Sequence, residues 1–173
     1  MIELESTPPL NVDILIIGAG PVGVTLARAL AAGPLRTLLI DSRPRGAWIT
    51  DPRALAISYG SRQLLERLDA WDTRAGTAIQ EIHVSQRGGV GRSLISADDY
   101  GTPALGYGMR DRDLASALDV GIASEQLIEQ CSVSGIETDG EQATVTVSQQ
   151  GTTRVIKARL VVHAEGTPHD DPD

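Results

Sequence analysis

The segment that decides the fold runs from Val12 to Asp41 and reads VDILIIGAGPVGVTLARALAAGPLRTLLID. It opens with an apolar run, broken by one aspartate, that is typical of a strand buried on both faces of a parallel sheet. Apolar residues then recur at helical spacing as far as Gly33-Pro34, and a second apolar run ends at Asp41. The segment therefore predicts a strand over 12–17, a helix and a strand over 37–40, which form a strand–helix–strand unit.

The turn after the first strand carries the pattern G-x-G-x-x-G. Gly18 permits a tight turn, Gly20 lets the backbone approach a pyrophosphate, and Gly23 lets the helix pack on the strand. The helix N-terminus offers N–H groups and a partial positive charge to phosphates. Asp41 follows Gly18 by 23 positions, where an acid that accepts ribose hydroxyls is expected. The pattern predicts a dinucleotide site; the alternative is a structural glycine turn in which Asp41 is a cap.

Composition excludes several functional classes. The 173 residues include 15 Lys and Arg against 23 Asp and Glu, a formal net charge of −8, and only 3% are aromatic. Both figures argue against a nucleic-acid partner bound through counterion release or base stacking. The single cysteine, Cys131, rules out an internal disulfide and is expected to be a small buried apolar residue.

Metal binding and membrane insertion are not expected either. His83, His163 and His169 are too scattered in the sequence to suggest a metal site. No apolar run approaches the roughly 20 residues of a membrane span, and the N-terminus lacks the basic flank of a signal peptide. We therefore expect a cytoplasmic protein without a metal.

In the middle of the chain, the strand–helix alternation does not continue. Two prolines mark a loop over 42–53. Seven residues fit one face of a predicted helix: Ala54, Ile57, Ser61, Leu64, Leu65, Leu68 and Trp71. Strands are predicted over 79–85 and 93–96 around a turn at Gly88-Gly89, followed by a helix over 112–118.

In the last third of the chain, apolar and polar residues alternate with a period of two. Strands over 127–138, 142–148 and 152–157, with turns at Asp139-Gly140 and Gln150-Gly151, predict an antiparallel meander. A short strand over 160–162 then leads into Ala164-Glu165-Gly166. Because a nicotinamide dehydrogenase would continue as strand–helix–strand after Asp41, this layout favours FAD over NAD.

The chain resembles a known family at several places. Residues 13–41 look like the opening of the FAD-dependent aromatic hydroxylases of the p-hydroxybenzoate hydroxylase group. The block DPRALAIS over 51–58, with Leu64-Leu65 and Trp71 downstream, is similar to the ubiquinone-biosynthesis hydroxylase subfamily, as is LGYGMR over 105–110. The resemblance covers nearly the whole chain. It implies an α/β, Rossmann-like FAD-binding domain of the glutathione-reductase type, with a βαβ start and an antiparallel β-meander.

The resemblance also implies roles for single residues. Arg53 would lie against the flavin or its pyrophosphate, unless it is a surface arginine of a loop. Arg110 would be a second FAD contact, although the alignment also allows Asp111 there. Val133 would approach the adenine through its backbone, or be a plain core valine.

The family's second FAD signature, Gly-Ala-Asp-Gly, matches His163-Ala164-Glu165-Gly166 with two departures. Glutamate keeps the carboxylate but adds a methylene, so its contact must shift or pass through water. No catalytic side chain is assigned, and His163 is expected to be structural. The full set of candidate cofactor-binding residues is Gly18, Gly20, Pro21, Val22, Gly23, Asp41, Ser42, Arg53, Arg110, Val133, Glu165 and Gly166.

A third family motif, a Gly-Asp pair before a helix, does not occur in these residues. We therefore expect residues 1–173 to be the FAD-binding N-terminal part of a larger flavoprotein, inactive alone, with 76–108 as the start of a substrate-domain sheet. The expected activity is hydroxylation of a phenolic ring, of the ubiquinone-precursor kind, with NADH or NADPH and O2. The alternatives are an FAD-dependent oxidase or reductase and a stand-alone dinucleotide-binding module.

The expected partner is a small aromatic substrate. A polyprenyl substrate would imply peripheral contact of the full-length protein with the inner membrane, although no basic docking patch is evident in the sequence. The sequence predicts no oligomeric state.

Overall fold

The computed structural model describes residues 8–47, 53–85 and 91–166, and the chain divides into two compact units. The first unit comprises residues 1–47 and 118–173, and the second comprises residues 48–117. Part of the predicted loop over 42–53 and the predicted turn at Gly88-Gly89 lie outside the described residues.

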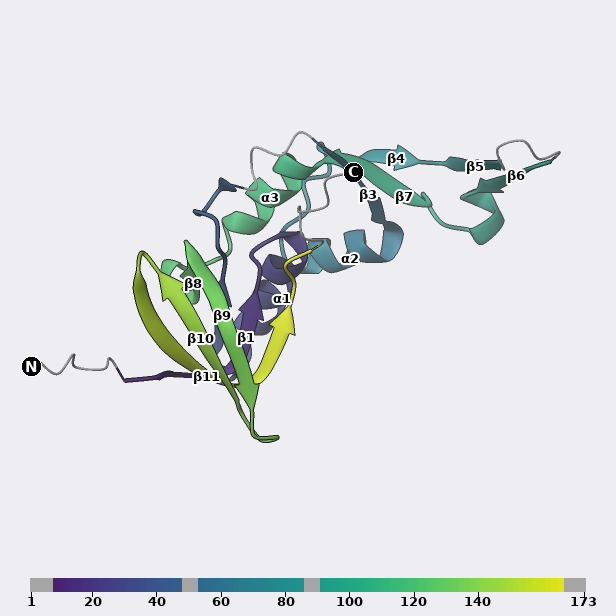
Figure 1. Cartoon of the computed structure of the whole chain (residues 1–173). Helices are drawn as coiled ribbons and strands as arrows, with labels where there is room; N and C mark the ends of the chain where they lie inside the picture. Colours follow the sequence, from purple (N-terminus) through teal and green to yellow (C-terminus); the bar gives the residue numbers. More distant parts are fainter. Residues whose placement is uncertain (1–7, 48–52, 86–90, 167–173) are drawn as a thin grey trace, which may run out of the picture. The chain divides into compact units, whose positions relative to one another are not determined.

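The first unit is built on a six-stranded sheet with the order β8-β2-β1-β11-β10-β9. Strand β1 pairs in parallel with β2 and β11, and β2 also pairs in parallel with β8. Strands β9, β10 and β11 form the antiparallel meander that the sequence predicts (Figure 1). The elements are β1 (Leu10–Ile17), α1 (Pro21–Ala31), β2 (Thr37–Ile40), a 3-10 helix (Ser124–Gln126), β8 (Leu127–Ile128), β9 (Cys131–Thr138), β10 (Ala143–Gln149) and β11 (Thr152–His163).

Strand β11 corrects one prediction. The sequence predicts two strands, over 152–157 and 160–162, whereas the structure has one strand of 12 residues. No glycine or proline interrupts it, Ala158 is buried, and Arg159 forms an ion pair of 3.1 Å with Asp13. The strand can therefore pair with β10 on one edge and with β1 on the other.

The prediction of one strand over 127–138 is also wrong, because the structure has two strands there, β8 and β9. The chain turns at Gln130, whose φ is 51°, so that β8 pairs with β2 and β9 pairs with β10. The N–H of Gln130 donates to the carbonyl of Arg43, and the N–H of Cys131 donates to that of Asp41. These bonds tie the break to the residues that follow β2.

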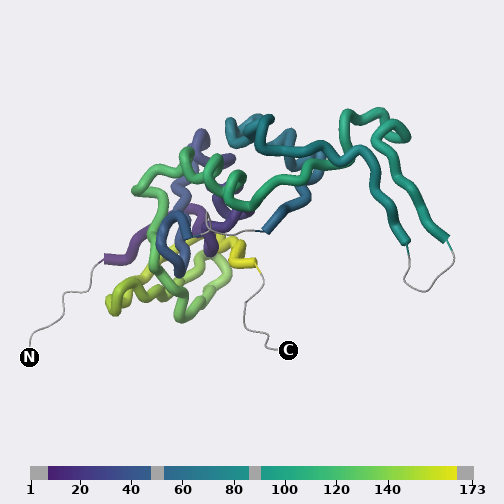
Figure 2. The backbone as a smooth tube through the Cα atoms, turned by 90° about the horizontal axis from the view of Figure 1, so that it is seen from above, coloured from purple at the N-terminus to yellow at the C-terminus, as the bar shows by residue number. Residues whose placement is uncertain are grey.

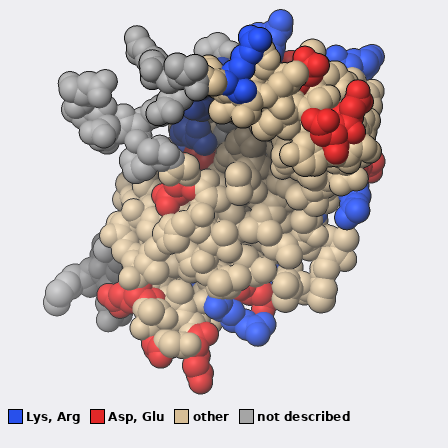
Figure 3. Space-filling model, turned by 90° about the vertical axis from the view of Figure 1, so that its right-hand side faces the viewer, with Lys and Arg blue, Asp and Glu red and all other residues tan. Residues whose placement is uncertain are grey.

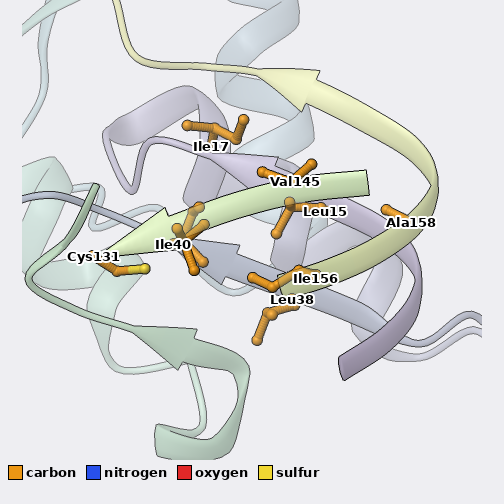
Figure 4. Close-up of a cluster of buried hydrophobic side chains, with 9 residues drawn as sticks. Leu15, Ile17, Leu38, Ile40, Cys131, Val145, Ile156 and Ala158 are labelled. Carbon is orange, nitrogen blue, oxygen red and sulfur yellow. The ribbon is translucent and has the colours of Figure 1, made fainter. Parts of the chain in front are cut away.

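The core of the first unit lies between the parallel strands and the meander. Figure 4 shows side chains of β1 and β2 gathered with those of β9, β10 and β11. The cluster contains Leu15, Ile17, Leu38, Ile40, Cys131, Val145, Val147, Ile156 and Ala158. Burial raises the pKa of the Cys131 thiol, and the side chain is 2% exposed, which confirms its apolar role. Helix α1 packs against β1 and β2.

The second unit holds two small sheets, with the orders β3-β7-β4 and β5-β6. The antiparallel strands β5 and β6 form a hairpin whose two sides run together in Figure 2. The elements are β3 (Ala54–Ser58), α2 (Tyr59–Arg67), β4 (Thr77–Ile79), β5 (Glu81–Ser85), β6 (Arg92–Ser96), a 3-10 helix (Asp98–Tyr100), β7 (Gly106–Arg110) and α3 (Asp111–Asp119), whose last two residues belong to the first unit.

The helix predicted from Ala54 onward begins too early. Ala54 and Ile57 lie in β3, which pairs with β7, and α2 starts only at Tyr59. The Ser58 hydroxyl accepts the N–H of Ser61 and caps the helix at this boundary. Apolar spacing could not separate the strand from the helix that follows it directly.

Strand β7 is not predicted by the sequence, because its two glycines are unusual in strands. A Cβ at Gly106 would lie 2.7 Å from the carbonyl oxygen of Ile57 on the paired strand. Tyr107 packs edge-to-face on Trp71, with ring centroids 5.4 Å apart, and Arg62 stacks over the Tyr107 ring and bonds its hydroxyl. These contacts hold β7 to α2 and to the loop after it.

No helix in the described ranges is long and apolar enough to cross a bilayer. Nor do three His, Cys, Asp or Glu side chains of these ranges gather as a metal site would require. On the face shown in Figure 3, the described basic side chains (blue) lie among acidic ones (red).

Candidate functional site

The candidate site lies in the first unit, where β1, β2 and β11 all end. In α/β sheets, ligands bind at the carboxyl ends of parallel strands. The N–H of Gly18 donates to the carbonyl of Ile40 at 2.8 Å, and that of Ala164 donates to the carbonyl of Ile17 at 2.7 Å. The N–H of Asp41 bonds to the carbonyl of Ile128 at 3.1 Å. The predicted glycine turn, the acid after β2 and the second signature are therefore joined at one edge.

The three glycines of the turn have different surroundings. Gly18 has a φ of 103°, and a Cβ there would lie 2.5 Å from the carbonyl oxygen of Ala164. A Cβ at Gly23 would lie 1.9 Å from the carbonyl oxygen of Gly18. At Gly20, in contrast, nothing lies within 4 Å of the Cβ position. Packing therefore requires Gly18 and Gly23, whereas the space beside Gly20 is open to a ligand.

Helix α1 begins at this turn. Gly20 is its N-cap and Pro21 its first residue, where a missing N–H costs no helical hydrogen bond. In the described part of the chain, no side chain caps this N-terminus, and its first turn holds no acid. The N–H groups and the positive end of the helix dipole are therefore left for an anion. Val22, also a candidate, is 74% exposed there.

Asp41 holds the glycine turn in place. It is 4% exposed, and its Oδ2 accepts the N–H of Ala19 at 2.7 Å. The backbone N–H of Arg43 donates to Oδ1 at 2.8 Å, and the Arg43 guanidinium donates to Oδ1 and Oδ2, both at 3.0 Å. Burial raises the pKa of the Asp41 carboxyl, but the hydrogen bonds from Arg43 and Ala19 outweigh it and lower that pKa below its ordinary value. Asp41 is therefore ionised.

Arg43 is a functional candidate that the sequence reasoning missed. A carboxylate has about four acceptor positions, and four protein donors point at Asp41. A ribose hydroxyl would therefore take the place of an Arg43 donor. The available signal was the position of Arg43, a cation two residues after the acid that ends β2. The ribose role of Asp41 stays a prediction.

A small cavity joins these residues. It has a volume of about 90 Å³ and is lined by Ile17, Gly18, Asp41, Ser42, Arg43 and Glu165. Ligand pockets commonly measure about 300–1,000 Å³, so this cavity can hold only part of a dinucleotide. It brings Ser42 and Glu165 next to Gly18 and Asp41, as expected for four of the candidate residues.

The second signature contains an exposed contact between two side chains. Nδ1 of His163 lies 2.9 Å from Oε2 of Glu165, and their side chains are 61% and 56% exposed. Gly166 has a φ of 75°, a conformation that favours glycine. The sequence predicts a structural His163 but gives no sign of its contact with Glu165.

The remaining candidates lie on other elements. Val133, on β9, packs against the core cluster, which accounts for its apolar side chain; its approach to an adenine stays a prediction. In the second unit, Arg53 directly precedes β3, and Arg110 is the last residue of β7, where it pairs with Ala54. The N–H of Asp111 donates to the carbonyl of Arg53, whose guanidinium lies 3.9 Å from the buried Asp111 carboxylate. The FAD contacts of both arginines stay predictions.

The loop after Asp41 is anchored by Arg45. Its guanidinium donates to the Asp119 carboxylate at 3.0 Å and to the carbonyls of Asp119 and Ile122, and its N–H donates to Glu129. These carbonyls lie at and just after the C-terminal end of α3, where a cation is favourable. Arg45 thus fixes the loop that carries Ser42 and Arg43.

Replacing Arg45 by methionine should therefore lower the free energy of unfolding by about 2 kcal/mol, because several acceptors lose a charged donor. Urea denaturation of the Arg45→Met variant measures this loss. Arg74→Met is the matched control, since the Arg74 side chain is 90% exposed and its ion pair is with Asp72, only two residues away. Equal stabilities for the two variants would contradict the anchoring role.

These features fit the phosphate and ribose groups of FAD: open space at Gly20, an uncapped helix N-terminus and a buried ionised acid at the end of β2. The comparison with a protein-family model supports this. The FAD binding domain model matches residues 11–168, which is most of the chain.

Individual relatives agree with the family model. The chain is 31% identical over 162 residues to ubiquinone hydroxylase UbiL of Rhodospirillum rubrum, covering 89% of this chain and 37% of the relative. It is 30% identical to digeranylgeranylglycerophospholipid reductase 1 of Methanothermobacter thermautotrophicus, covering 90% of this chain and 39% of that one. The chain thus spans less than two fifths of the length of these relatives.

Among solved structures, p-nitrophenol 4-monooxygenase PnpA of Pseudomonas putida DLL-E4 shares the fold. The TM-score is 0.71 at 15% identity, and the match covers 91% of this chain and 42% of that one. The predicted α/β, Rossmann-like fold with its meander is confirmed by this likeness and by the sheet topology. The chain belongs to the FAD binding domain family.

Proposed function

We propose that the chain is the FAD-binding part of a flavin-dependent monooxygenase that hydroxylates a phenolic ring, of the ubiquinone-precursor kind, with NADH or NADPH and O2. The observation that carries the proposal is the cavity that joins Gly18, Asp41 and Glu165, in a chain 31% identical to a ubiquinone hydroxylase. The small aromatic substrate is part of the proposal.

Each group at the edge of the sheet has a role in this proposal. The N-terminus of α1 binds the diphosphate, because its N–H groups are uncapped and Gly20 leaves room for close approach. Asp41 orients the adenosine ribose, and Arg43 supplies a positive charge beside it. When bound, FAD supplies the redox chemistry with the reduced nicotinamide and O2.

We also propose that residues 76–108 begin a substrate-domain sheet. The β5–β6 hairpin exposes Ile82, Val84 and Leu94, which are between 40% and 52% accessible. An isolated two-stranded hairpin is marginally stable in water, so exposed apolar residues on such a hairpin favour its continuation into a larger sheet. The division of the chain at residues 48–117 is compatible with this organisation.

A second candidate function is FAD-dependent reduction of an isoprenoid chain. It is favoured by the 30% identity to the digeranylgeranylglycerophospholipid reductase, which is nearly equal to the identity with the hydroxylase. The two functions share the FAD site and differ in the group that is transferred.

The test uses the full-length protein that contains this chain. Purified protein should carry bound flavin and oxidise NADH or NADPH faster when a phenolic quinone precursor is added. Under ¹⁸O₂, one labelled oxygen should enter the ring. If the phenolic quinone precursor does not stimulate oxidation of NADH or NADPH, and a geranylgeranyl double bond is reduced instead, the second function is favoured. The proposal also includes a cytoplasmic location with peripheral contact to the membrane. High salt should then release the full-length protein from the membrane fraction.

A further inference from the structure

The hydrogen bonds at Asp41 are of two kinds. The backbone N–H groups of Ala19 and Arg43 donate to Oδ2 at 2.7 Å and to Oδ1 at 2.8 Å. The Arg43 guanidinium adds a second bond to each oxygen, from Nε to Oδ1 and from Nη2 to Oδ2, both at 3.0 Å. Because a carboxylate has about four acceptor positions, one backbone bond and one side-chain bond to each oxygen fill them.

The backbone bonds are fixed by the fold, whereas the guanidinium bonds depend on one side chain. Ala19 lies in the glycine turn between β1 and α1, and the N–H of Cys131 donates to the carbonyl of Asp41 at 2.8 Å, just before the loop that carries Arg43. The Arg43 side chain is 50% exposed, while that of Asp41 is only 4% exposed. A half-exposed arginine on a flexible stem moves at a lower cost than a buried backbone group. The guanidinium is therefore the part of this cluster that a ligand can displace.

The guanidinium occupies the acceptor positions that a ribose would use. Its planar geometry holds Nε and Nη2 side by side, and the two nitrogens meet both oxygens of one carboxylate. The adjacent hydroxyls of a ribose form a comparable pair of donors, and the acid that ends the second strand is where they are expected to bind. Arg43 also lines the cavity of about 90 Å³ beside Asp41. Movement of its side chain would therefore free both acceptor positions and enlarge the cavity.

Exchange of one pair of donors for the other avoids a bare buried charge. Asp41 is ionised and nearly buried, and such a carboxylate is strongly destabilised when it loses its hydrogen bonds. We propose that Arg43 is a displaceable substitute for a ribose diol: its guanidinium holds Asp41 until two hydroxyls replace it, and it returns when the ligand leaves. Arg43 thereby sets how much affinity the diol contributes. This inference deepens the proposed function and rests on it, since it assumes that the ribose of FAD reaches Asp41.

Adenosine ligands with and without the diol test the exchange in the full-length protein that contains this chain, stripped of flavin. The probes are ADP and 2′,3′-dideoxy-ADP, each titrated in competition with FAD and followed by flavin fluorescence. In the wild type the hydroxyls of ADP only replace the guanidinium bonds, so ADP should bind about twofold more tightly than the dideoxy probe. In Arg43→Met no guanidinium holds these positions, and the preference for ADP should rise to about tenfold.

The ratio of the two dissociation constants separates exchange from a general loss of charge, because losing a cation weakens both anionic probes alike. Arg43→Lys keeps the charge, but one ammonium cannot match the paired donors of a guanidinium, so its preference for ADP should also exceed that of the wild type. Arg36→Met is the matched control. Arg36 is exposed and directly precedes β2, at the end opposite to Asp41, so this variant should keep the wild-type ratio. Both backbone bonds to Asp41 remain in the Arg43 variants, which should therefore fold.

The movement of the side chain can be followed by NMR with ¹⁵N-labelled arginine. The Nε–H resonance of Arg43 is assigned by its absence from Arg43→Met. It should shift strongly when ADP saturates the site, because Nε loses its carboxylate partner. The dideoxy probe should shift it far less, since the guanidinium then stays on Asp41.

A preference for ADP that is no larger in Arg43→Met and Arg43→Lys than in the wild type would overturn the proposal, because Arg43 would then not compete with the diol. An Nε–H resonance that responds equally to both probes would also overturn it. A wild-type protein that binds neither FAD nor ADP is a different result, which would contradict the proposed function itself.

Discussion

Replacing Gly23 by alanine is expected to destabilise the first unit by about 3 kcal/mol and to abolish FAD binding. The added Cβ would lie 1.9 Å from the carbonyl oxygen of Gly18 and 3.3 Å from the Cβ of Ala164. The nearest of these atoms belongs to the backbone, so no side-chain rotation relieves the clash. Helix α1 would have to move off β1, and the turn at its N-terminus would move with it. Urea denaturation and FAD titration measure the two effects.

Gly20→Ala separates folding from binding at the same turn. Nothing lies within 4 Å of its Cβ position, so this variant should fold with nearly the stability of the wild type. Its FAD dissociation constant should nevertheless rise about a hundredfold, because the methyl group occupies the space through which the backbone meets the diphosphate. Gly60→Ala, in α2, also meets nothing within 4 Å and is the control for alanine in open space. Normal FAD binding by Gly20→Ala would contradict the placement of the diphosphate.

The second large effect is expected at Asp41. Asp41→Ala should lower the free energy of unfolding by about 2–3 kcal/mol, because the N–H groups of Ala19 and Arg43 lose their acceptor at a nearly buried site. FAD affinity should fall at least tenfold, since both the glycine turn and Arg43 lose their anchor. The measurements are the same urea denaturation and FAD titration. A stable Asp41→Ala variant with normal affinity would remove the role of Asp41.

The pKa of Asp41 adds a pH dependence to this prediction. Its pKa is lower in the folded chain than the ordinary 3.8, so the ionised carboxylate stabilises the fold fully above about pH 3.8. That contribution is lost as the pH falls through the lowered pKa. The stability difference between the wild type and Asp41→Asn should therefore be constant near neutral pH and shrink in acid. A difference that instead grows in acid would contradict the assignment.

The βαβ start could be predicted because its signals are local and agree with one another. The buried run before Gly18, the helical spacing after it and the apolar run up to Asp41 each indicate one element, and the structure confirms all three. The alternation around Val145 and Val147 likewise predicts a half-buried strand, and both valines are buried in β10.

What the sequence could not supply depends on pairing between distant segments. β11 is continuous because β10 and β1 flank it on both edges, and no local signal reveals this. β8 is only two residues long and exists because it pairs with β2. In the site, the motif identified Asp41 but not the four donors that hold it: Ala19 meets Asp41 only through the fold, and the motif assigns no role to the nearby Arg43.

The most direct test of the central claim is a competition titration of the purified chain with FAD and NAD. The geometry of the glycine turn and the family membership predict that one FAD binds per chain, that excess NAD does not displace it, and that Gly20→Ala raises the FAD dissociation constant about a hundredfold. Preferential binding of NAD over FAD would contradict the account. A Gly20→Ala variant that binds FAD as tightly as the wild type would also contradict it.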